Sequence, residues 1–369
     1  MKKILTLLYC LIASYGFAQK NYLLVGTYTF AEDRKGIYVF NFDSINNTLA
    51  YVSNTTNLSN PSYLAISKNK QFIYAVNEDG GPDSQGAVSA FSFNADSGSL
   101  NLLNKVAVGG AHPCYVAVSN NNKKLYTANY GGGSVSELSI NSNGTIGKLL
   151  SVRKFEGKSF NPKRQDAPHA HACIFSPDAK YLFITDLGTD KVYIHRFSEE
   201  KGLSKSPTTT IKSASGSGPR HLAFHPSKPW VYIIEEITGT VTGYLYKDGI
   251  TRAFQTIASS NETSEDKGSA DIHISPDGNF LYTTNRGKTH NIVTYSINQQ
   301  KGQLTKIDET PTGEAPRNFL ITASGSHVFV ANQKSNSIII FTRNSLTGKL
   351  TQVNTVQDVP SPVCLKMLD

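Results

Sequence analysis

The sequence is poor in the residues that stabilise small disulfide-rich or metal-bound domains. It contains four cysteines, two methionines and one tryptophan in 369 residues. Three cysteines lie beyond the first 18 residues, and this odd number without a CxxC pair argues against a disulfide framework and a zinc ribbon. Each lies within an apolar alternation and is predicted to be a small buried side chain: Cys114, Cys173 and Cys364.

Several patterns that would indicate other functions are also missing. The sequence has no GxSxG elbow, Walker loop, HExxH motif or dinucleotide-binding glycine motif, so those chemistries have no support. Beyond the N-terminal segment, no apolar run is long enough to span a membrane. No basic run is interleaved with aromatic residues, and a nucleic-acid partner is therefore not expected.

The first 18 residues predict a secretory signal peptide. Lys2 and Lys3 form its basic start, residues 4–13 its apolar core and residues 16–18 a small-residue cleavage site. Cleavage after Ala18 removes two lysines and no acids, which lowers the net charge from +8 to +6. We expect the mature protein to be periplasmic or secreted, as a monomer or weak dimer. Its modest positive charge favours small anionic substrates.

Turn-forming and aromatic residues are abundant, with 29 glycines, 18 tyrosines and 18 phenylalanines. This composition is typical of short strands joined by turns. An 18-residue template recurs, exemplified by PRHLAFHPSKPWVYIIEE, in which two apolar strands flank a short turn. Six copies occupy residues 61–78, 113–130, 170–187, 219–236, 269–286 and 316–333.

The spacing of the copies predicts the fold. They start 47 to 57 residues apart, and each unit contains about four strand-like runs, which is the pattern of a β-propeller. Residues 360–366 match the first strand of a seventh copy and residues 22–29 match its second strand. A blade built from both termini closes the ring and leaves no open sheet edge. We therefore predict an all-β protein, one seven-bladed propeller of four-stranded blades over residues 19–369.

Two positions of the template, its second and its last residue, point to a shared site. They lie at adjoining ends of two antiparallel strands, and the innermost strands of a propeller line its channel. Arginines that converge there suit an anionic, oxygen-rich ligand, and histidine or glutamate can accept a proton. The second position holds Ser62, Cys114, His171, Arg220, Ala270 and Arg317, and the last holds Glu78, Tyr130, Leu187, Glu236, Arg286 and Gln333.

Other interpretations of these residues stay open. Arginine and glutamate at neighbouring strand ends can form ion pairs between blades. The residue before the last (Asp186, Glu235 or asparagine) caps a turn or, in a metal-dependent propeller, binds a cation. Converging arginines disfavour a cation, so no metal is expected. The insertion at residues 155–168 is either a lid or a tolerated surface loop.

Three segments carry a family resemblance: GPRHLAFHP followed by a strand and Glu236, ADIHISPDGNFLYTTNR, and PHAHACIFSPD. They resemble the seven-bladed β-propeller lactonases, which include one type of 6-phosphogluconolactonase and the fungal carboxy-cis,cis-muconate lactonizing enzymes. The resemblance covers essentially the whole mature chain and implies a cofactor-free axial site that opens or closes lactone rings. By motif it implies catalytic roles for His171, Arg220, Glu236 and Arg286. The remaining candidates, for substrate binding, are Arg317, Glu78, Tyr130, Gln333 and His169.

Three functions are compatible with these residues. The first is hydrolysis of a sugar-type lactone, with Glu236 or His171 as general base and an arginine stabilising the oxyanion. The second is a cycloisomerase that closes the ring of a muconate-like diacid with the same residues. The third is a non-catalytic binding propeller of the cell surface or periplasm. Export separates the protein from cytoplasmic phosphosugars, which leaves phosphorylation of the substrate undecided.

Overall fold

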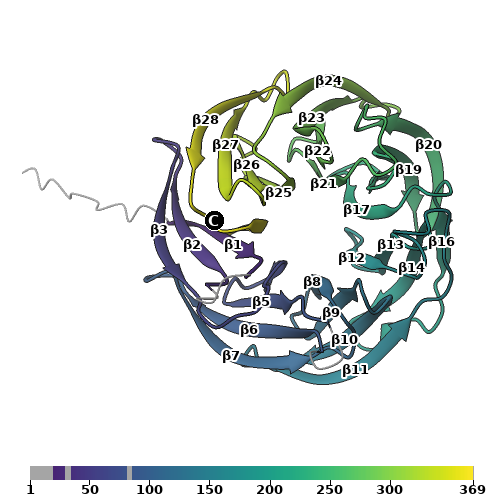
Figure 1. Cartoon of the computed structure of the whole chain (residues 1–369). Coiled ribbons are helices and arrows are strands. Elements are labelled where there is room, and N and C mark those ends of the chain that lie inside the picture. The colour runs from purple at the N-terminus through teal and green to yellow at the C-terminus, as the bar shows by residue number, and fades with distance from the viewer. Residues whose placement is uncertain (1–19, 30–34, 81–84, 369) are drawn as a thin grey trace, which may run out of the picture.

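The computed structural model describes residues 20–29, 35–80 and 85–368. Within these ranges the chain forms strands and no helix, and the strands make seven sheets around one axis (Figure 1). The predicted all-β, seven-bladed propeller is confirmed. In these ranges there is accordingly no helix long and apolar enough to cross a membrane. The predicted signal peptide, residues 1–18, lies outside the described residues.

Six blades follow the six copies of the template, and each begins with its innermost strand. Blade 1 contains β4 (Leu64–Ile66), β5 (Phe72–Asn77), β6 (Ala87–Asn94) and β7 (Ser99–Ala107). Blade 2 contains β8 (Pro113–Val118), β9 (Lys124–Asn129), β10 (Ser134–Ile140) and β11 (Ile146–Lys154). Blade 3 contains β12 (Ala170–Phe175), β13 (Tyr181–Asp186), β14 (Lys191–Ser198), β15 (Gly202–Leu203) and β16 (Thr209–Lys212).

The second half of the ring repeats this order. Blade 4 contains β17 (Pro219–Phe224), β18 (Trp230–Glu235), β19 (Thr240–Lys247) and β20 (Ile250–Ala258). Blade 5 contains β21 (Ser269–Ile274), β22 (Phe280–Arg286), β23 (His290–Ile297) and β24 (Leu304–Pro311). Blade 6 contains β25 (Pro316–Ile321), β26 (His327–Asn332), β27 (Ser337–Arg343) and β28 (Leu350–Val356).

Blade 7 is built from both ends of the chain, as predicted. Its innermost strand is β29 (Pro362–Leu368), followed by β1 (Asn21–Thr27), β2 (Tyr38–Asp43) and β3 (Thr48–Asn54). Strands β29 and β1 are antiparallel, and they lie side by side as yellow and purple ribbons in Figure 1. Their pairing places residues more than 340 positions apart, such as Tyr22 and Leu368, opposite each other. The ring is therefore closed by backbone hydrogen bonds.

Blade 3 departs from the predicted four strands. Its outer strand is divided into β15 and β16, and both pieces pair with β14. Pro207 lies between the two pieces. Proline has no backbone N–H to donate to the ladder, so a continuous strand through this position would lose a hydrogen bond.

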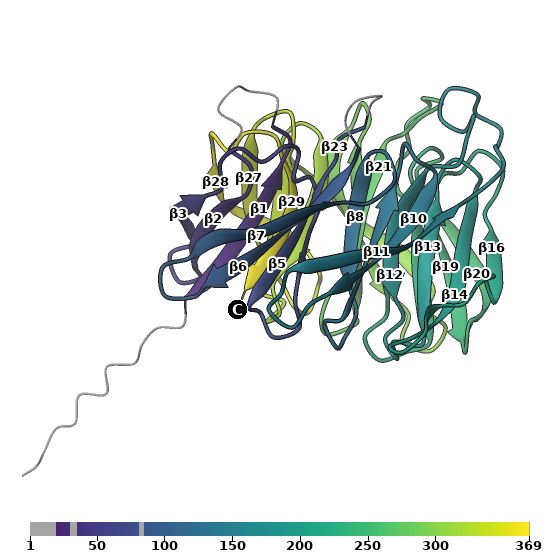
Figure 2. The same cartoon turned by 90° about the horizontal axis from the view of Figure 1, so that it is seen from below.

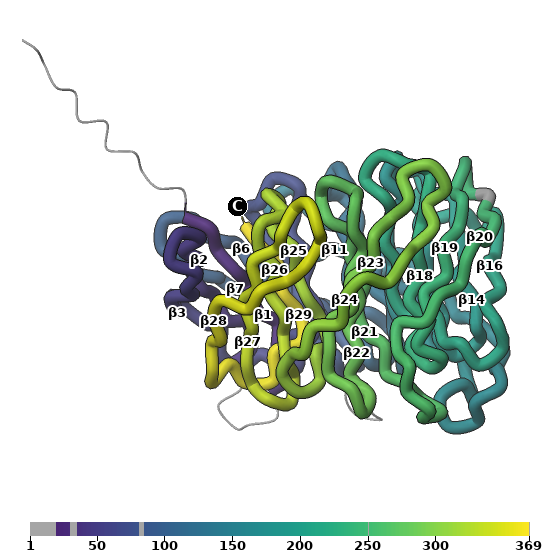
Figure 3. The backbone as a smooth tube through the Cα atoms, turned by 90° about the horizontal axis from the view of Figure 1, so that it is seen from above, coloured from purple at the N-terminus to yellow at the C-terminus, as the bar shows by residue number. Residues whose placement is uncertain are grey.

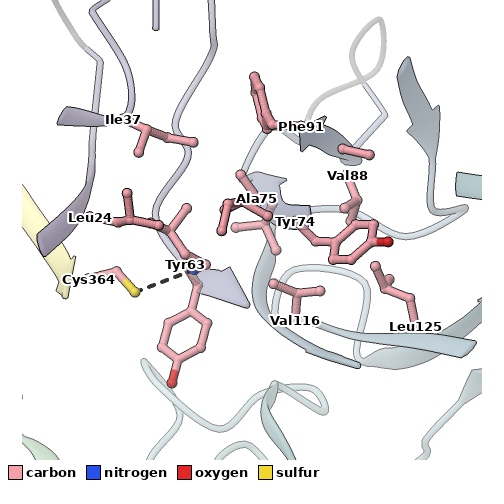
Figure 4. Packing of buried hydrophobic residues seen from close by; sticks show 14 of the residues in the cluster. Leu24, Ile37, Tyr63, Tyr74, Ala75, Val88, Phe91, Val116, Leu125 and Cys364 are labelled. Atoms are coloured by element: carbon pink, nitrogen blue, oxygen red, sulfur yellow. Dashed lines mark hydrogen bonds between the residues drawn. The ribbon is translucent and has the colours of Figure 1, made fainter. Parts of the chain in front are cut away.

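The apolar core lies between neighbouring blades. Seen from the side, the ring is a disc with turns on both faces (Figures 2 and 3). Inner strands such as β13 are buried throughout, whereas outer strands such as β3 are largely accessible. Figure 4 shows the joint between blades 7 and 1, where Leu24, Ile37 and Tyr63 pack near Cys364. Cys114, Cys173 and Cys364 are free and buried, which confirms their predicted role.

Gly26 in β1 tests this joint. A Cβ at Gly26 would lie 2.4 Å from the carbonyl oxygen of Pro61, which is backbone and cannot move aside easily. We expect Gly26→Ala to lower the free energy of unfolding by about 1–3 kcal/mol, as overpacking does. Gly147→Ala is the control, because its nearest neighbour is the flexible hydroxyl of Ser139. Urea unfolding curves check the difference, and equal stabilities of the two variants would contradict the tight joint.

Candidate functional site

In blades 2, 3, 4 and 6 a bulge in the innermost strand turns one side chain toward the axis. In blade 4, Pro219 pairs with Glu235 and His221 pairs with Ile234, so the ladder passes over Arg220. The ladders of blades 2, 3 and 6 pass over Cys114, His171 and Arg317 in the same way. Bulges characteristically re-aim a side chain. One small cavity is lined by Ser62, Cys114, His171, Arg220, Arg317 and Val363.

The buried carboxylate of Glu236 is the centre of the site. Glu236 directly follows β18 and is 2% exposed. Its Oε2 lies 2.8 Å from Arg220 Nε and 3.0 Å from Arg286 Nη2. Its Oε1 lies 2.6 Å from Arg164 Nη2. Arg220 comes from β17 in blade 4 and Arg286 from the end of β22 in blade 5, so the cluster is assembled across blades.

The charges in this cluster depend on one another. Burial alone would raise the pKa of Glu236, but Arg286, Arg220 and Arg164 outweigh it and hold the pKa well below its usual range. Burial lowers the pKa of Arg220 to about 10, and Glu236 limits that decrease. Glu236 is therefore ionised at neutral pH and fully engaged by guanidinium groups, which makes it a weak base in this state.

His171 has a buried ring nitrogen without a partner in the axial cluster. Its side chain is buried, and its Nδ1 has no hydrogen-bond partner among the described residues. Burial, followed by the charge of Arg220, lowers the pKa of His171 well below its usual value. The imidazole is therefore neutral at neutral pH. A buried polar atom without a protein partner beside a cavity is available to a ligand.

A layer of hydrogen bonds lies beneath His171 and Arg220. The ring of His221 packs edge-on against that of His171, with centroids 5.3 Å apart. His221 Nδ1 lies 2.8 Å from Asp271 Oδ1, and His273 Nε2 lies 3.0 Å from Asp271 Oδ2. The second nitrogen of His221 faces Arg220 Nη1 at 3.4 Å. This layer restricts the orientation of the two axial side chains above it.

A second carboxylate, Glu78, lies in blade 1. The hydroxyl of Tyr28 donates to Glu78 Oε2 at 2.9 Å, and the hydroxyl of Ser62 donates to the same oxygen. Arg317 Nη2 donates to the Tyr28 hydroxyl at 2.9 Å and its guanidinium lies over the Tyr28 ring. The structure thus brings the predicted residues Glu78 and Arg317 together through a tyrosine.

The other predicted binding residues differ in their surroundings. The rings of Tyr130 and His169 stack with centroids 4.4 Å apart, and Tyr130 contacts His171 edge-on at 5.6 Å. His169 Nδ1 lies 3.0 Å from the carbonyl oxygen of Tyr130. Gln333 bonds through its backbone N–H to the carbonyl oxygen of Ala315, and among the described residues its side chain makes no hydrogen bond to either carboxylate. Tyr130 and His169 form a wall of the site, and Gln333 stays a prediction.

Sequence reasoning missed Arg164, Asp266 and Tyr28. Arg164 lies in the insertion at residues 155–168, and its guanidinium contacts both Glu236 and Asp266. The sequence marked this insertion as irregular and charged, but nothing in it distinguishes Arg164 from its neighbours. Tyr28 was detectable, because it occupies the last template position of the split seventh copy.

The residue that directly precedes the last template position caps a turn in blades 2, 3 and 4. Asn129 Nδ2 donates to the hydroxyls of Ser134 and Ser136, and Asp186 accepts from Thr189 and from backbone N–H groups. Glu235 accepts from Thr240 and Thr242. In the described part of the chain, no three His, Cys, Asp or Glu side chains gather where they could hold a metal ion. The capping interpretation accounts for these side chains.

Comparisons with known proteins agree with this architecture. The family described as "Lactonase, 7-bladed beta-propeller" matches residues 22–367. A protein named 6-phosphogluconolactonase from Formosa agariphila is 36% identical over 337 residues, which cover 90% of this chain and 95% of the relative. A solved structure from Bacteroides fragilis is 39% identical with a TM-score of 0.90, and covers 95% of this chain and 99% of its own.

A third similar protein is the periplasmic gluconolactonase of Pseudomonas aeruginosa. Its structure is 31% identical with a TM-score of 0.89, and covers 95% of this chain and 99% of its own. With the family match extending over almost all described residues, the chain belongs to the seven-bladed β-propeller lactonases.

Proposed function

We propose that this protein hydrolyses a sugar-type lactone at the axial site. Relatives named 6-phosphogluconolactonase and gluconolactonase support this substrate class. The observation that carries the proposal is the buried, unpartnered Nδ1 of His171 in the same cluster as Glu236 and its arginines. A neutral base beside fixed cationic donors is the combination that ester hydrolysis requires.

In this proposal His171 activates the water. Its neutral imidazole accepts a proton from a water molecule as that water attacks the lactone carbonyl carbon. Glu236 is the weaker candidate for this step, because guanidinium groups pair with both of its oxygens, whereas His171 Nδ1 has no partner among the described residues. The role of Glu236 is then to keep Arg220 and Arg286 in place.

Arg286 is the candidate donor to the developing oxyanion. Its Nη2 pairs with Glu236, while its buried Nε has no hydrogen-bond partner among the described residues. Arg220 is engaged on both sides, by Glu236 and by the carbonyl oxygen of Ala270. As the tetrahedral intermediate collapses, the bond from the carbonyl carbon to the ring oxygen breaks. The protonated His171 then returns its proton to that oxygen, which becomes the hydroxyl of the product acid.

Replacing His171 tests the function. We expect the mature protein to hydrolyse at least one of 6-phosphogluconolactone, gluconolactone and muconolactone, with and without a chelator. His171→Asn should lower kcat/KM by roughly 100-fold or more, as loss of a general base does. A pH indicator follows acid release. His225→Asn is the control, because His225 follows the end of β17 opposite Arg220 and its imidazole bonds to the carbonyl oxygen of Gly278. A folded wild type without turnover would favour the binding propeller, and ring closure on the diacid would favour the cycloisomerase.

The pH dependence provides a separate test. His171 acts as a base only when it is unprotonated, and burial lowers the pKa at which it gains a proton. Activity should therefore persist as the pH falls through about 6.5, the ordinary histidine pKa, and decline only well below it. The profile of kcat/KM for a lactone that does not titrate in this range checks this. A midpoint at or above about 6.5 would contradict the assignment.

Export belongs to the same proposal. It is supported by the basic and apolar start of the sequence and by the periplasmic relative. We expect the mature chain to begin at Gln19, and mass spectrometry of protein recovered from the periplasm or medium checks this. Protein that keeps residues 1–18 and stays in the cytoplasm would overturn it.

A further inference from the structure

Arg164 differs from the other arginines of the cluster in its origin and accessibility. It is supplied by the insertion at residues 155–168, whereas Arg220 and Arg286 belong to strands. Its side chain is 28% exposed, compared with 21% for Arg286 and 2% for Arg220. Its guanidinium bridges two carboxylates, with Nη2 on Glu236 and Nη1 on Asp266. Arg164 is thus the most accessible cation on Glu236.

The backbone that carries Arg164 is held firmly. Gln165 is fully buried, and its Nε2 donates to the carbonyl oxygen of Leu187 at 2.8 Å and to Asp190 Oδ1 at 2.7 Å. The hydroxyl of Ser159 donates to the other oxygen of Asp190. The insertion is therefore anchored at two points around Arg164. A change of partner by Arg164 requires only rotation of its side chain.

Both partners can release Arg164. Glu236 keeps Arg220 and Arg286 on its Oε2 when Oε1 loses Arg164. Asp266 is 34% exposed and lies in the loop at residues 259–268. Burial, followed by the charge of Glu236, raises the pKa of Asp266 even beside Arg164, so its carboxylate is a poorly stabilised partner. A stronger anion at this place would displace it.

We propose that Arg164 determines substrate specificity: its guanidinium binds an anionic substituent of the lactone, a phosphate or carboxylate, and Asp266 holds that place until the substrate binds. Arginine matches both anions because its planar fork can form two parallel hydrogen bonds. A substituent must displace Asp266 to bind Arg164, and a full negative charge does so more readily than a neutral hydroxyl group. This inference rests on the proposed lactonase function and adds the charge of the substrate to it.

The experiment compares lactones that share one ring. They are gluconolactone with a 6-phosphate, the corresponding lactone with a carboxylate at that carbon, and neutral gluconolactone. We expect Arg164→Gln to lower the ratio of kcat/KM for the anionic lactones over the neutral lactone roughly 10- to 100-fold, the effect of losing hydrogen bonds between charged groups. Asp266→Asn should raise this ratio. The two anionic lactones separate a preference for phosphate from one for carboxylate.

The chain offers matched controls. Lys163 and Glu265 are the sequence neighbours of Arg164 and Asp266, and they line a groove on these two loops together with Phe160 and Ile237. Lys163→Gln and Glu265→Gln remove the same charges without touching Glu236, and the ratio should not change. An equal loss for neutral and anionic lactones in Arg164→Gln, or an equal effect of Lys163→Gln, would overturn the inference.

Binding measurements keep the test independent of turnover. Calorimetry with 6-phosphogluconate and gluconate should show a preference for the phosphorylated acid in the wild type that Arg164→Gln abolishes. The same preference in both proteins would overturn the role of Arg164. A wild type that shows this preference but hydrolyses no lactone would instead refute the proposed function and leave the anion site in place.

Discussion

The buried carboxylate of Glu236 is the interaction on which the site depends. Removing a carboxylate and several guanidinium groups from water is unfavourable by several kcal/mol per ion, and only close pairing offsets it. Arg220, Arg286 and Arg164 provide that pairing from blade 4, blade 5 and the insertion before blade 3. None of these segments could hold the cluster alone. The closed ring, with its backbone pairing of β29 and β1, keeps the three contributions at fixed positions.

The site also shows how a repeated scaffold acquires chemistry. The inner strands of blades 2, 3, 4 and 6 have the same bulge, and the cores between the blades leave it little freedom to move. The bulge carries a thiol at Cys114, an imidazole at His171 and a guanidinium at Arg220 and Arg317. Substitution at this one position thus changes the site without altering the fold. Polar side chains here do not pair in the sheet, so they remain available to a ligand.

The axis has two unlike sides. Around Glu236, cations outnumber the carboxylate they surround, and a neutral His171 lies close to them. Around Glu78, the carboxylate accepts hydrogen bonds from the hydroxyl groups of Ser62 and Tyr28. Arg317 donates to the Tyr28 hydroxyl, which links it to that carboxylate. The first side is suited to a reacting ester and to anionic groups. The second offers hydroxyl donors and acceptors of the kind that bind the hydroxyl groups of a sugar ring.

The sequence by itself determined the propeller, its closure by both termini and two of the positions that face the axis, because repetition and period-two alternation are local properties. It placed His171, Arg220, Glu236 and Arg286 in one site, and it placed Tyr28 at a strand end without marking it as functional. Only the tertiary structure decided that Glu236 is saturated by arginines while His171 keeps a free nitrogen, since both depend on contacts between blades. Arg164 comes from an irregular insertion that is anchored by Asp190, and Asp266 comes from a second irregular loop; neither loop follows a periodic pattern. For that physical reason the sequence could not predict their contact with the site.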